Sequence, residues 1–393
     1  MTPIEIGVLG IVILIILLLI RVPVGIAMIG AGAFGSILLT PGGAVPALTQ
    51  LAGHITGITQ IQALAAIAFF ILMAVILQKS NVGIALFEIT KHLLRLRVGG
   101  EKIASMCAFA MRMLIPFCIA LVIMGFLLFE PTGQALVAGI VPGILIAIIF
   151  LILVAIASKV LPRLHSASDE VQAYFPKQAL KLVWIFPVIF LVGFLGLFFG
   201  IVTVTEAAAV GAFLAFMFAL LTRQMTMKVF MESLVESAKT TGKVFVSVIG
   251  GIVFGLFITR SLIGLALSNF ADSLSCPPVV MLIVILALYL VLGLFVERLA
   301  VLVILTPLAY PMIQSVGIRG IWFGVLALIS LMIAEFIAQD WSERRASSID
   351  AFMRPRYVFA EQGPLVLSLV IVCALVVIFP SIATLLAYLM IGR

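Results

Sequence analysis

The chain has 393 residues, of which 64% are hydrophobic and only 10% are charged. A chain of this length with so few polar residues cannot cover a water-soluble surface, so the composition excludes a soluble globular protein and predicts a membrane protein. The net charge of +7 does not indicate nucleic-acid binding, because the basic residues are scattered among membrane flanks and form no single basic domain.

Apolar blocks recur along the whole chain, and we expect an all-α polytopic fold with roughly ten to twelve membrane passes. The first block, 9–20, has no basic segment before it and no small-residue cleavage site after it, so we interpret it as a retained first helix. The other blocks are 61–77, 121–128, 135–157, 182–199, 244–258, 279–296, 299–308, 321–338 and 365–387.

A nine-residue motif occurs twice, as QKSNVGIAL at 78–86 and as TRSLIGLAL at 259–267. The long polar stretch 158–181 falls between the two copies. We therefore predict a first transmembrane repeat at 1–157, a polar linker at 158–181 and a second repeat at 182–393. Duplicated halves in membrane proteins commonly form inverted repeats that expose a midplane site alternately, which indicates transport. Duplication without a transport function is the alternative.

Two further pairs of segments fit this division. GIAMIGAGAF at 25–34 and AAAVGAFLAF at 207–216 are rich in small residues suited to close helix packing. Segments 86–96 and 227–236 each carry apolar residues on one helical face and charges on the other, so we predict interfacial arm helices there. An ordinary charged connecting loop is the alternative for each arm.

Four carboxylates lie within or beside apolar blocks, namely Glu130, Glu206, Glu297 and Glu335. Ionisable residues at such positions are functional candidates, because an unpaired charge at a helix centre costs at least about 2.5–3.5 kcal/mol. Glu206 follows Thr203 and Thr205 at a break between two apolar blocks. This pattern is compatible with a helix N-cap and equally with a ligand site.

Glu297 lies between short apolar arms, with Thr306 and Pro307 farther along. Two short arms around a charged tip predict a re-entrant hairpin whose tip lines a protein-enclosed cavity. The alternative is a loop at the membrane surface. Pro116 is a candidate for breaking a helix and freeing carbonyl groups for a cation, although proline also kinks helices for structural reasons.

Motifs for enzyme chemistry are absent from the sequence. No glycine-rich phosphate loop, HExxH, GxSxG or Cys/His metal cluster occurs, and the three histidines are isolated. The four cysteines have no redox or metal-ligand spacing. We therefore predict that the protein is not an enzyme.

With these motifs assembled, the chain resembles the large permease subunit of tripartite ATP-independent periplasmic (TRAP) transporters. The resemblance runs through VPVGIAM at 22–28, LAAIAFFILMAVILQKS at 64–80, LIPFCIALVIMG at 114–125, ALVAGIVPG at 135–143, GIVTVTEAAAV at 200–210 and the run from 292 to 326. It implies a multi-pass protein of the bacterial inner membrane that takes up organic acids such as dicarboxylates by sodium symport and an elevator-type movement. It also implies two partners, a small TRAP membrane subunit and a periplasmic substrate-binding protein, with Na⁺ as coupling ion and no other cofactor.

The resemblance also implies site residues. Glu297 to Pro307 matches the family's second re-entrant hairpin, and Pro116 matches its first broken helix. We predict Glu297, Thr306, Pro307, Thr203, Thr205, Glu206 and Pro116 as substrate or ion-binding residues.

The chain departs from the family pattern at three places. Between Gly100 and Ile115 it is too short to contain the first hairpin, and the Pro-Pro-Ser of the first break is PFC at 116–118. From Ala338 a charged run, AQDWSERR, replaces the second break. These changes leave an alternative open, a transport-incompetent TRAP-permease-like membrane protein that acts as a scaffold or is a degenerate copy.

Overall fold

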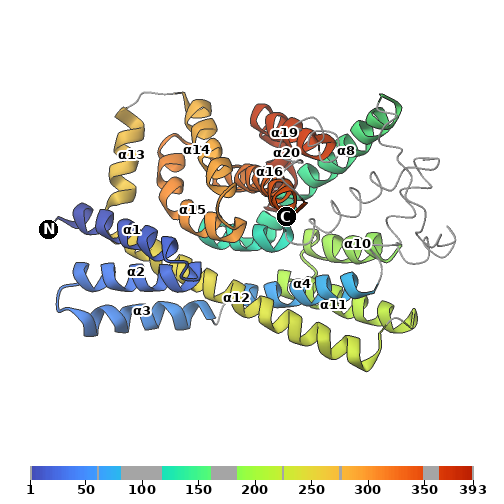
Figure 1. Cartoon of the computed structure of the whole chain (residues 1–393), viewed down its shortest axis with the longest axis horizontal. Coiled ribbons are helices and arrows are strands. Elements are labelled where there is room, and N and C mark those ends of the chain that lie inside the picture. Colours follow the sequence, from blue (N-terminus) through green and yellow to red (C-terminus); the bar gives the residue numbers. More distant parts are fainter. Residues whose placement is uncertain are drawn as a thin grey trace. The chain divides into compact units, whose positions relative to one another are not determined.

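A computed structural model describes residues 2–59, 62–80, 117–160, 184–223, 225–273, 277–347 and 363–391. Every regular element in these ranges is a helix (Figure 1), which confirms the all-α prediction. The first copy of the nine-residue motif lies outside the described residues after Ser80, as do nearly all of the polar linker and the arm predicted at 86–96.

The labelled helices are α1 Pro3–Leu19, α2 Val24–Leu39, α3 Ala44–Thr59, α4 Gln62–Lys79, α7 Thr132–Ala138, α8 Ile140–Val160, α10 Ile185–Phe198, α11 Val204–Leu221, α12 Met227–Arg260, α13 Ile263–Ser273, α14 Pro278–Gly293, α15 Arg298–Ser315, α16 Gly320–Ser347, α19 Gly363–Ile378 and α20 Ser381–Ile391. A further apolar helix, Phe117–Leu127, precedes α7.

Several helices have the length and composition to cross a membrane. Among the described residues five helices meet both criteria, and six shorter apolar helices of 10–17 residues accompany them. The predicted last block, 365–387, is not one straight helix, because α19 and α20 are bent by 66° at a short break. Pro380 lies in this break, where it cannot continue the helix before it. The fold is that of a polytopic membrane protein.

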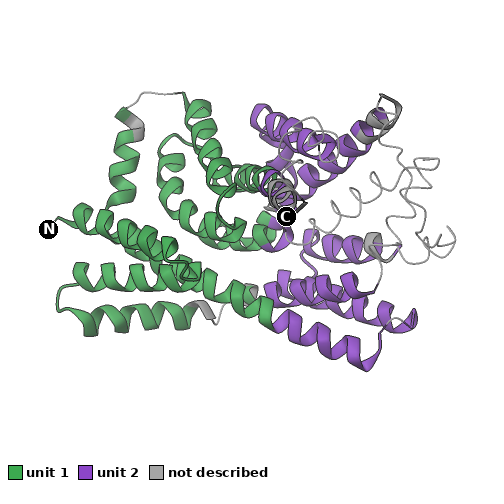
Figure 2. Cartoon of the chain, viewed as in Figure 1, with its two compact units in different colours: residues 1–65, 120–135, 239–334 green, residues 66–119, 136–238, 335–393 purple. Residues whose placement is uncertain are grey.

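The chain forms two compact units, each assembled from three separate stretches (Figure 2). Unit 1 comprises 1–65, 120–135 and 239–334, and unit 2 comprises 66–119, 136–238 and 335–393. Each unit therefore draws on both predicted halves of the chain. The division into repeats at 1–157 and 182–393 stays a prediction.

In unit 1, glycines allow α2 to approach α12 at backbone distance. A Cβ added to Gly25 would lie 2.6 Å from the backbone of Val246, and one added to Gly250 would lie 2.4 Å from the carbonyl oxygen of Gly25. Added Cβ atoms on Gly10 and Gly35 would both overlap the ring of Phe257. The small-residue segment 25–34 thus packs as its composition predicts, through close helix contact and not through large side chains.

In unit 2, α10 and α11 pack together with α4. The core contains Ile76 and Leu77 of α4, Ile189 of α10, and Ala215 and Phe218 of α11. Gly211 of α11 makes room for Met73, whose sulfur would lie 2.9 Å from an added Cβ. Elsewhere in the unit, α19 and α20 both pack on α8.

The second predicted arm is not a separate helix. Segment 227–236 is the beginning of α12, which continues for 34 residues to Arg260. Thr226 precedes the helix and accepts a hydrogen bond from the Val229 amide at 3.3 Å, as an N-cap residue does. In the first half, α3 and α4 occupy the corresponding stretch as two helices.

Candidate functional site

The candidate site in unit 1 is built on α14 and α15, which are joined by residues 294–297. Gly293 ends α14 close to α16, since a Cβ there would lie 2.7 Å from Ala334 and 3.0 Å from Leu331. The two helices fit the predicted hairpin in outline. The second helix, however, has 18 residues and runs past Thr306 and Pro307, so it is longer than the short apolar arm expected after Glu297.

Glu297 lies at the N-cap of α15, with φ −53° and ψ 137°. Its side chain is exposed and makes no capping hydrogen bond. Among the described residues the tip is thus exposed, and the choice between a re-entrant hairpin and a loop at the membrane surface stays a prediction.

Thr306 lies in the buried centre of this unit, with none of its surface exposed. Its hydroxyl donates a hydrogen bond to the Leu302 carbonyl, one turn back in α15. It lies 2.9 Å from the hydroxyl of Tyr289 on α14, which is also fully buried. Because the single proton of Thr306 is directed to Leu302, Tyr289 is the donor in this pair.

Two other helices complete the surroundings of this pair. The sulfur of Met124, on the Phe117–Leu127 helix, lies 3.6 Å from the Thr306 hydroxyl oxygen. The ring of Phe323 on α16 meets the Tyr289 ring edge to face, with centroids 5.9 Å apart. The Tyr289–Thr306 pair is thus enclosed by apolar groups, which makes each of its hydrogen bonds costly to lose.

Pro307 and Pro311 both lie inside α15. Each proline removes one amide donor from the helix, so the carbonyl groups of Val303 and Pro307 have lost their usual partners four residues on. Glycines provide space for the rings: Gly255 of α12 lies in ordinary contact with Pro307, and Gly264 of α13 lies close to Pro311. Gly264 belongs to the second copy of the nine-residue motif, so its close approach to Pro311 explains why a glycine is needed at this motif position.

Thr203 and Glu206 form a capping box at the start of α11, in unit 2. The Glu206 amide donates to the Thr203 hydroxyl at 3.3 Å, and the Thr203 amide donates to the Glu206 carboxylate at 2.7 Å. Thr2 and Glu5 form the same box at the start of α1. The helix-cap interpretation of Glu206 is confirmed as geometry. Thr205 is half-buried in the first turn.

Glu130 and Glu335 were the other two carboxylate candidates. Glu130 is half-buried, and its Oε1 would lie 2.8 Å from a Cβ added to Gly320, the first residue of α16. A carboxylate at a helix N-terminus is favourable because it opposes the positive end of the helix dipole. Glu335 is half-buried within α16. Of all the candidates, only Pro116 lies outside the described residues.

Comparison with known proteins supplies the family. The model of the tripartite ATP-independent periplasmic transporter DctM component matches residues 11–112 and 105–337. The chain belongs to the DctM family. The sialic acid TRAP transporter large permease protein SiaM of Vibrio cholerae is 32% identical over 289 residues, which are 71% of this chain and 65% of SiaM. The C4-dicarboxylate TRAP transporter large permease protein DctM of Pseudomonas aeruginosa is 26% identical over 56% of this chain and 51% of its own length.

This member of the DctM family thus spans between half and two thirds of the length of these two relatives. Both relatives are named as permease proteins and not as enzymes, in agreement with the prediction from the sequence. Among solved structures, the Alcanivorax borkumensis YdaH transporter superposes with a TM-score of 0.55 at 14% identity, over 86% of this chain and 89% of that one. At that identity the likeness concerns the fold alone.

The stretch where the resemblance to the family predicts a second break lies within α16. The helix α16 continues through Ala338 to Ser347, so the described part of the charged run extends a helix instead of breaking one. An unbroken helix keeps its carbonyl groups in intrahelical hydrogen bonds, and these groups are then not offered to a cation.

Sequence analysis missed Tyr289, the residue that holds Thr306 in place. The signal was present, because Tyr289 is the one side chain with a polar group in the apolar stretch that forms α14. A lone tyrosine in an apolar membrane helix needs a hydrogen-bond partner, and a threonine on a neighbouring helix satisfies that need.

Proposed function

We propose that this chain is a secondary-transporter subunit of the TRAP type. It takes up small organic acids with sodium by an elevator-type mechanism, together with a small membrane subunit and a periplasmic substrate-binding protein, in the bacterial inner membrane. The observation that carries the proposal is the match to the DctM component over residues 11–112 and 105–337, in a chain with helices long enough to cross a membrane.

The substrate class rests on the relatives. Their names include sialic acid and C4-dicarboxylate, and a third relative, TeaC of Halomonas elongata, is named for ectoine and is 29% identical over 69% of this chain. Two of these three substrates are named as acids, which supports the organic-acid class for this chain.

We propose the centre of α15 as the cation site in unit 1. The Thr306 hydroxyl and the carbonyl groups released by Pro307 and Pro311 are oxygen ligands, which hard cations prefer. A bound cation would compete for the Thr306 oxygen that now accepts from Tyr289. Glu297, Thr203, Thr205, Glu206 and Pro116 remain candidates for contributing charge or ligands.

The proposed two-repeat organisation receives support from matching helix ends. The offset in numbering that places residue 78 on residue 259 superposes the two nine-residue motifs. It also places Lys79, the last residue of α4, on Arg260, the last residue of α12. The same offset brings Thr40, the C-cap of α2, within one position of Thr222, the C-cap of α11. Both threonine hydroxyls donate back to a carbonyl group of the preceding turn. The likeness between the halves therefore extends well beyond the motif itself.

The proposal is tested by solute uptake into proteoliposomes that contain this chain and its small membrane subunit, with the binding protein supplied outside. Sialic acid, a C4-dicarboxylate and ectoine are each tested with an inward sodium gradient, and the same vesicles with potassium replacing sodium are the control. We expect uptake that requires both sodium and the binding protein. Uptake of none of them by a reconstituted complex that binds both partners would overturn the proposal.

A transport-incompetent permease-like protein is the second candidate, and one observation favours it. Helix α16 is continuous through the stretch where the resemblance to the family predicts a second break. This candidate predicts stable co-purification with the small subunit together with no uptake under any gradient. Sodium-dependent uptake would exclude it.

A further inference from the structure

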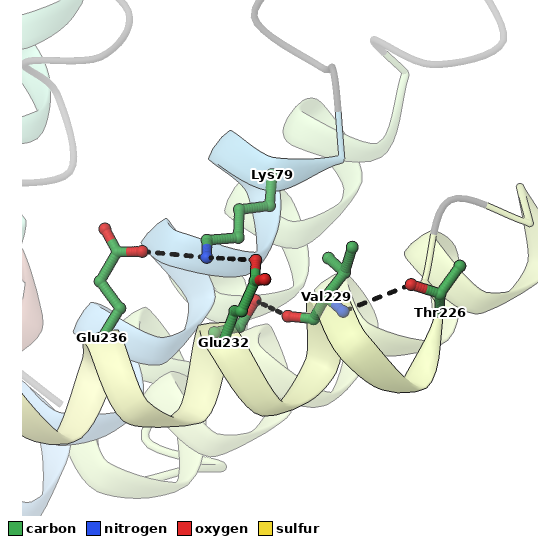
Figure 3. A network of polar contacts seen from close by, with 6 residues as sticks. Lys79, Thr226, Val229, Glu232 and Glu236 are labelled. Atoms are coloured by element: carbon green, nitrogen blue, oxygen red, sulfur yellow. Dashed lines mark hydrogen bonds and ion pairs between the residues drawn. The ribbon is translucent and has the colours of Figure 1, made fainter.

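The basic residue of each nine-residue motif contacts a helix from the other half of the chain. In this subsection we call the two contacted segments the arms: the first turns of α12, and α3, which occupies the corresponding stretch of the first half and differs from the segment 86–96 predicted above as an arm. In unit 2, the Lys79 ammonium group lies 3.1 Å from the Glu236 carboxylate and 3.5 Å from that of Glu232 (Figure 3). Lys79 comes from the first half, whereas both acids lie on the arm of the second half.

Unit 1 contains the corresponding contact with the halves exchanged. The Arg260 guanidinium donates to the Gln50 side-chain carbonyl at 2.7 Å. Arg260 ends α12 in the second half, and Gln50 lies on α3 in the first half. The offset that superposes the two motifs places Gln50 within one position of Glu232. In the proposed two-repeat organisation, the two basic residues therefore contact equivalent turns of the two arms.

The backbone around the two basic residues is also alike. Each is the last residue of its helix, where a positive charge opposes the negative end of the helix dipole. Each is followed by a buried serine, Ser80 or Ser261, whose hydroxyl donates back to a carbonyl of the last turn. The serine thus satisfies the helix end locally and leaves the basic side chain to reach outwards.

We infer that Lys79 and Arg260 are equivalent arm latches, positioning residues that each hold the arm of the opposite half against the end of a membrane helix. Sequence similarity at the motif, equal helix ends and contacts to equivalent turns are three separate observations, and coincidence does not account for all of them together. The inference concerns how each unit is held together, and it does not depend on the proposed transport activity.

The partners of the two latches differ in charge, which predicts that the two contacts differ in strength. Lys79 pairs with two carboxylates, whereas Arg260 meets a neutral amide. A hydrogen bond or ion pair at an exposed position is weak, so each latch should alter the local opening of an arm without unfolding the unit. Introducing a carboxylate at Gln50 should strengthen the Arg260 latch, because the bond becomes charge-assisted.

Hydrogen–deuterium exchange of the full chain in lipid nanodiscs tests the inference, read separately on peptides covering 44–59 and 227–238. Lys79→Met should speed exchange in 227–238 about two- to fivefold and leave 44–59 unchanged. Arg260→Met should do the reverse. Methionine keeps the bulk of the side chain and removes the charge and the donors. Lys79→Arg should restore the exchange of the parent chain.

Two further variants keep the test decisive. Lys228→Met removes an exposed lysine from the same arm and should leave exchange in 227–238 unchanged. Gln50→Glu should slow exchange in 44–59. The latch assignment would be overturned if Lys79→Met speeded exchange only in 44–59 and Arg260→Met only in 227–238. It would also be overturned if Lys228→Met speeded exchange in 227–238 as much as Lys79→Met does. A double Glu232→Gln/Glu236→Gln variant reaches the same contact from the arm side, so poor folding of a Lys79 variant would not prevent the test.

Discussion

Replacing Thr306 by valine should destabilise the protein more than replacing Tyr289 by phenylalanine, although each change removes the same hydrogen bond. Thr306→Val leaves the Tyr289 hydroxyl, which is fully buried, without its acceptor. An unsatisfied buried donor costs about 1–3 kcal/mol. Tyr289→Phe removes the donor instead, and Thr306 keeps its bond to Leu302, so the loss should be about 0.5–1.5 kcal/mol.

The double variant supplies the decisive comparison. With both groups apolar, no hydroxyl of the pair remains unsatisfied, so the double variant should be less destabilised than the sum of the single variants by roughly 0.5–1.5 kcal/mol. Interhelical hydrogen bonds in membrane proteins average about 0.6 kcal/mol, with a maximum near 1.7, which limits the expected coupling from above.

The measurement is reversible unfolding in mixed detergent micelles, followed by tryptophan fluorescence. Tyr310→Phe is the matched control, because Tyr310 lies on the same helix, is half-buried and accepts a long 3.4 Å hydrogen bond from Gln314. The control should change the unfolding free energy by less than about 0.5 kcal/mol. A larger loss for Tyr289→Phe than for Thr306→Val would show that the donor was assigned wrongly, and strict additivity in the double variant would show that the bond contributes nothing.

Three other outcomes are expected. Gly250→Ala should lower the unfolding free energy by about 1–3 kcal/mol in the same assay, because the new methyl group meets the backbone of α2, whereas Gly53→Ala, with open space around it, should not destabilise. Thr203→Ala should cost about 1 kcal/mol through loss of the α11 cap, and an unchanged melting temperature would contradict this. In the uptake assay, Glu297→Gln should weaken sodium dependence far more than Glu361→Gln does, and equal small effects would remove Glu297 from the candidate ion site.

Composition and small-residue patterns predicted a large part of the fold. The membrane class followed from apolar content and the all-α fold from the recurring apolar blocks. The close packing of segment 25–34 followed from its small residues, since Gly25 and Gly250 allow backbone contact. The capping box of Glu206 could also be predicted from the sequence, because Thr203 and Glu206 have the required spacing. The capping box is local in sequence, and the small residues of segment 25–34 indicate close packing even though the packing partner lies far along the chain.

Features that depend on tertiary contacts were harder to predict. The arm after Glu297 was expected to be short, but glycines on α12 and α13 leave room for the rings of Pro307 and Pro311, and α15 continues through both. Tyr289 was overlooked because its importance lies in a partner on another helix. The arm at 227–236 was recognised by its charges, but nothing in its own sequence states that it continues into the next apolar block as one helix.

The unbroken course of α12 has a mechanical consequence. Its 34 residues extend about 51 Å, well beyond the roughly 30 Å of bilayer hydrocarbon. The apolar part, 244–260, is therefore preceded by a charged helical segment, 227–243, that is about 25 Å long. Because the two parts form one continuous helix, a change of about 10° in the tilt of the apolar part would move the N-terminal end of the charged segment by about 4 Å. A change in the tilt of the apolar part would therefore carry Glu232 and Glu236 with it, because they lie on the same continuous helix.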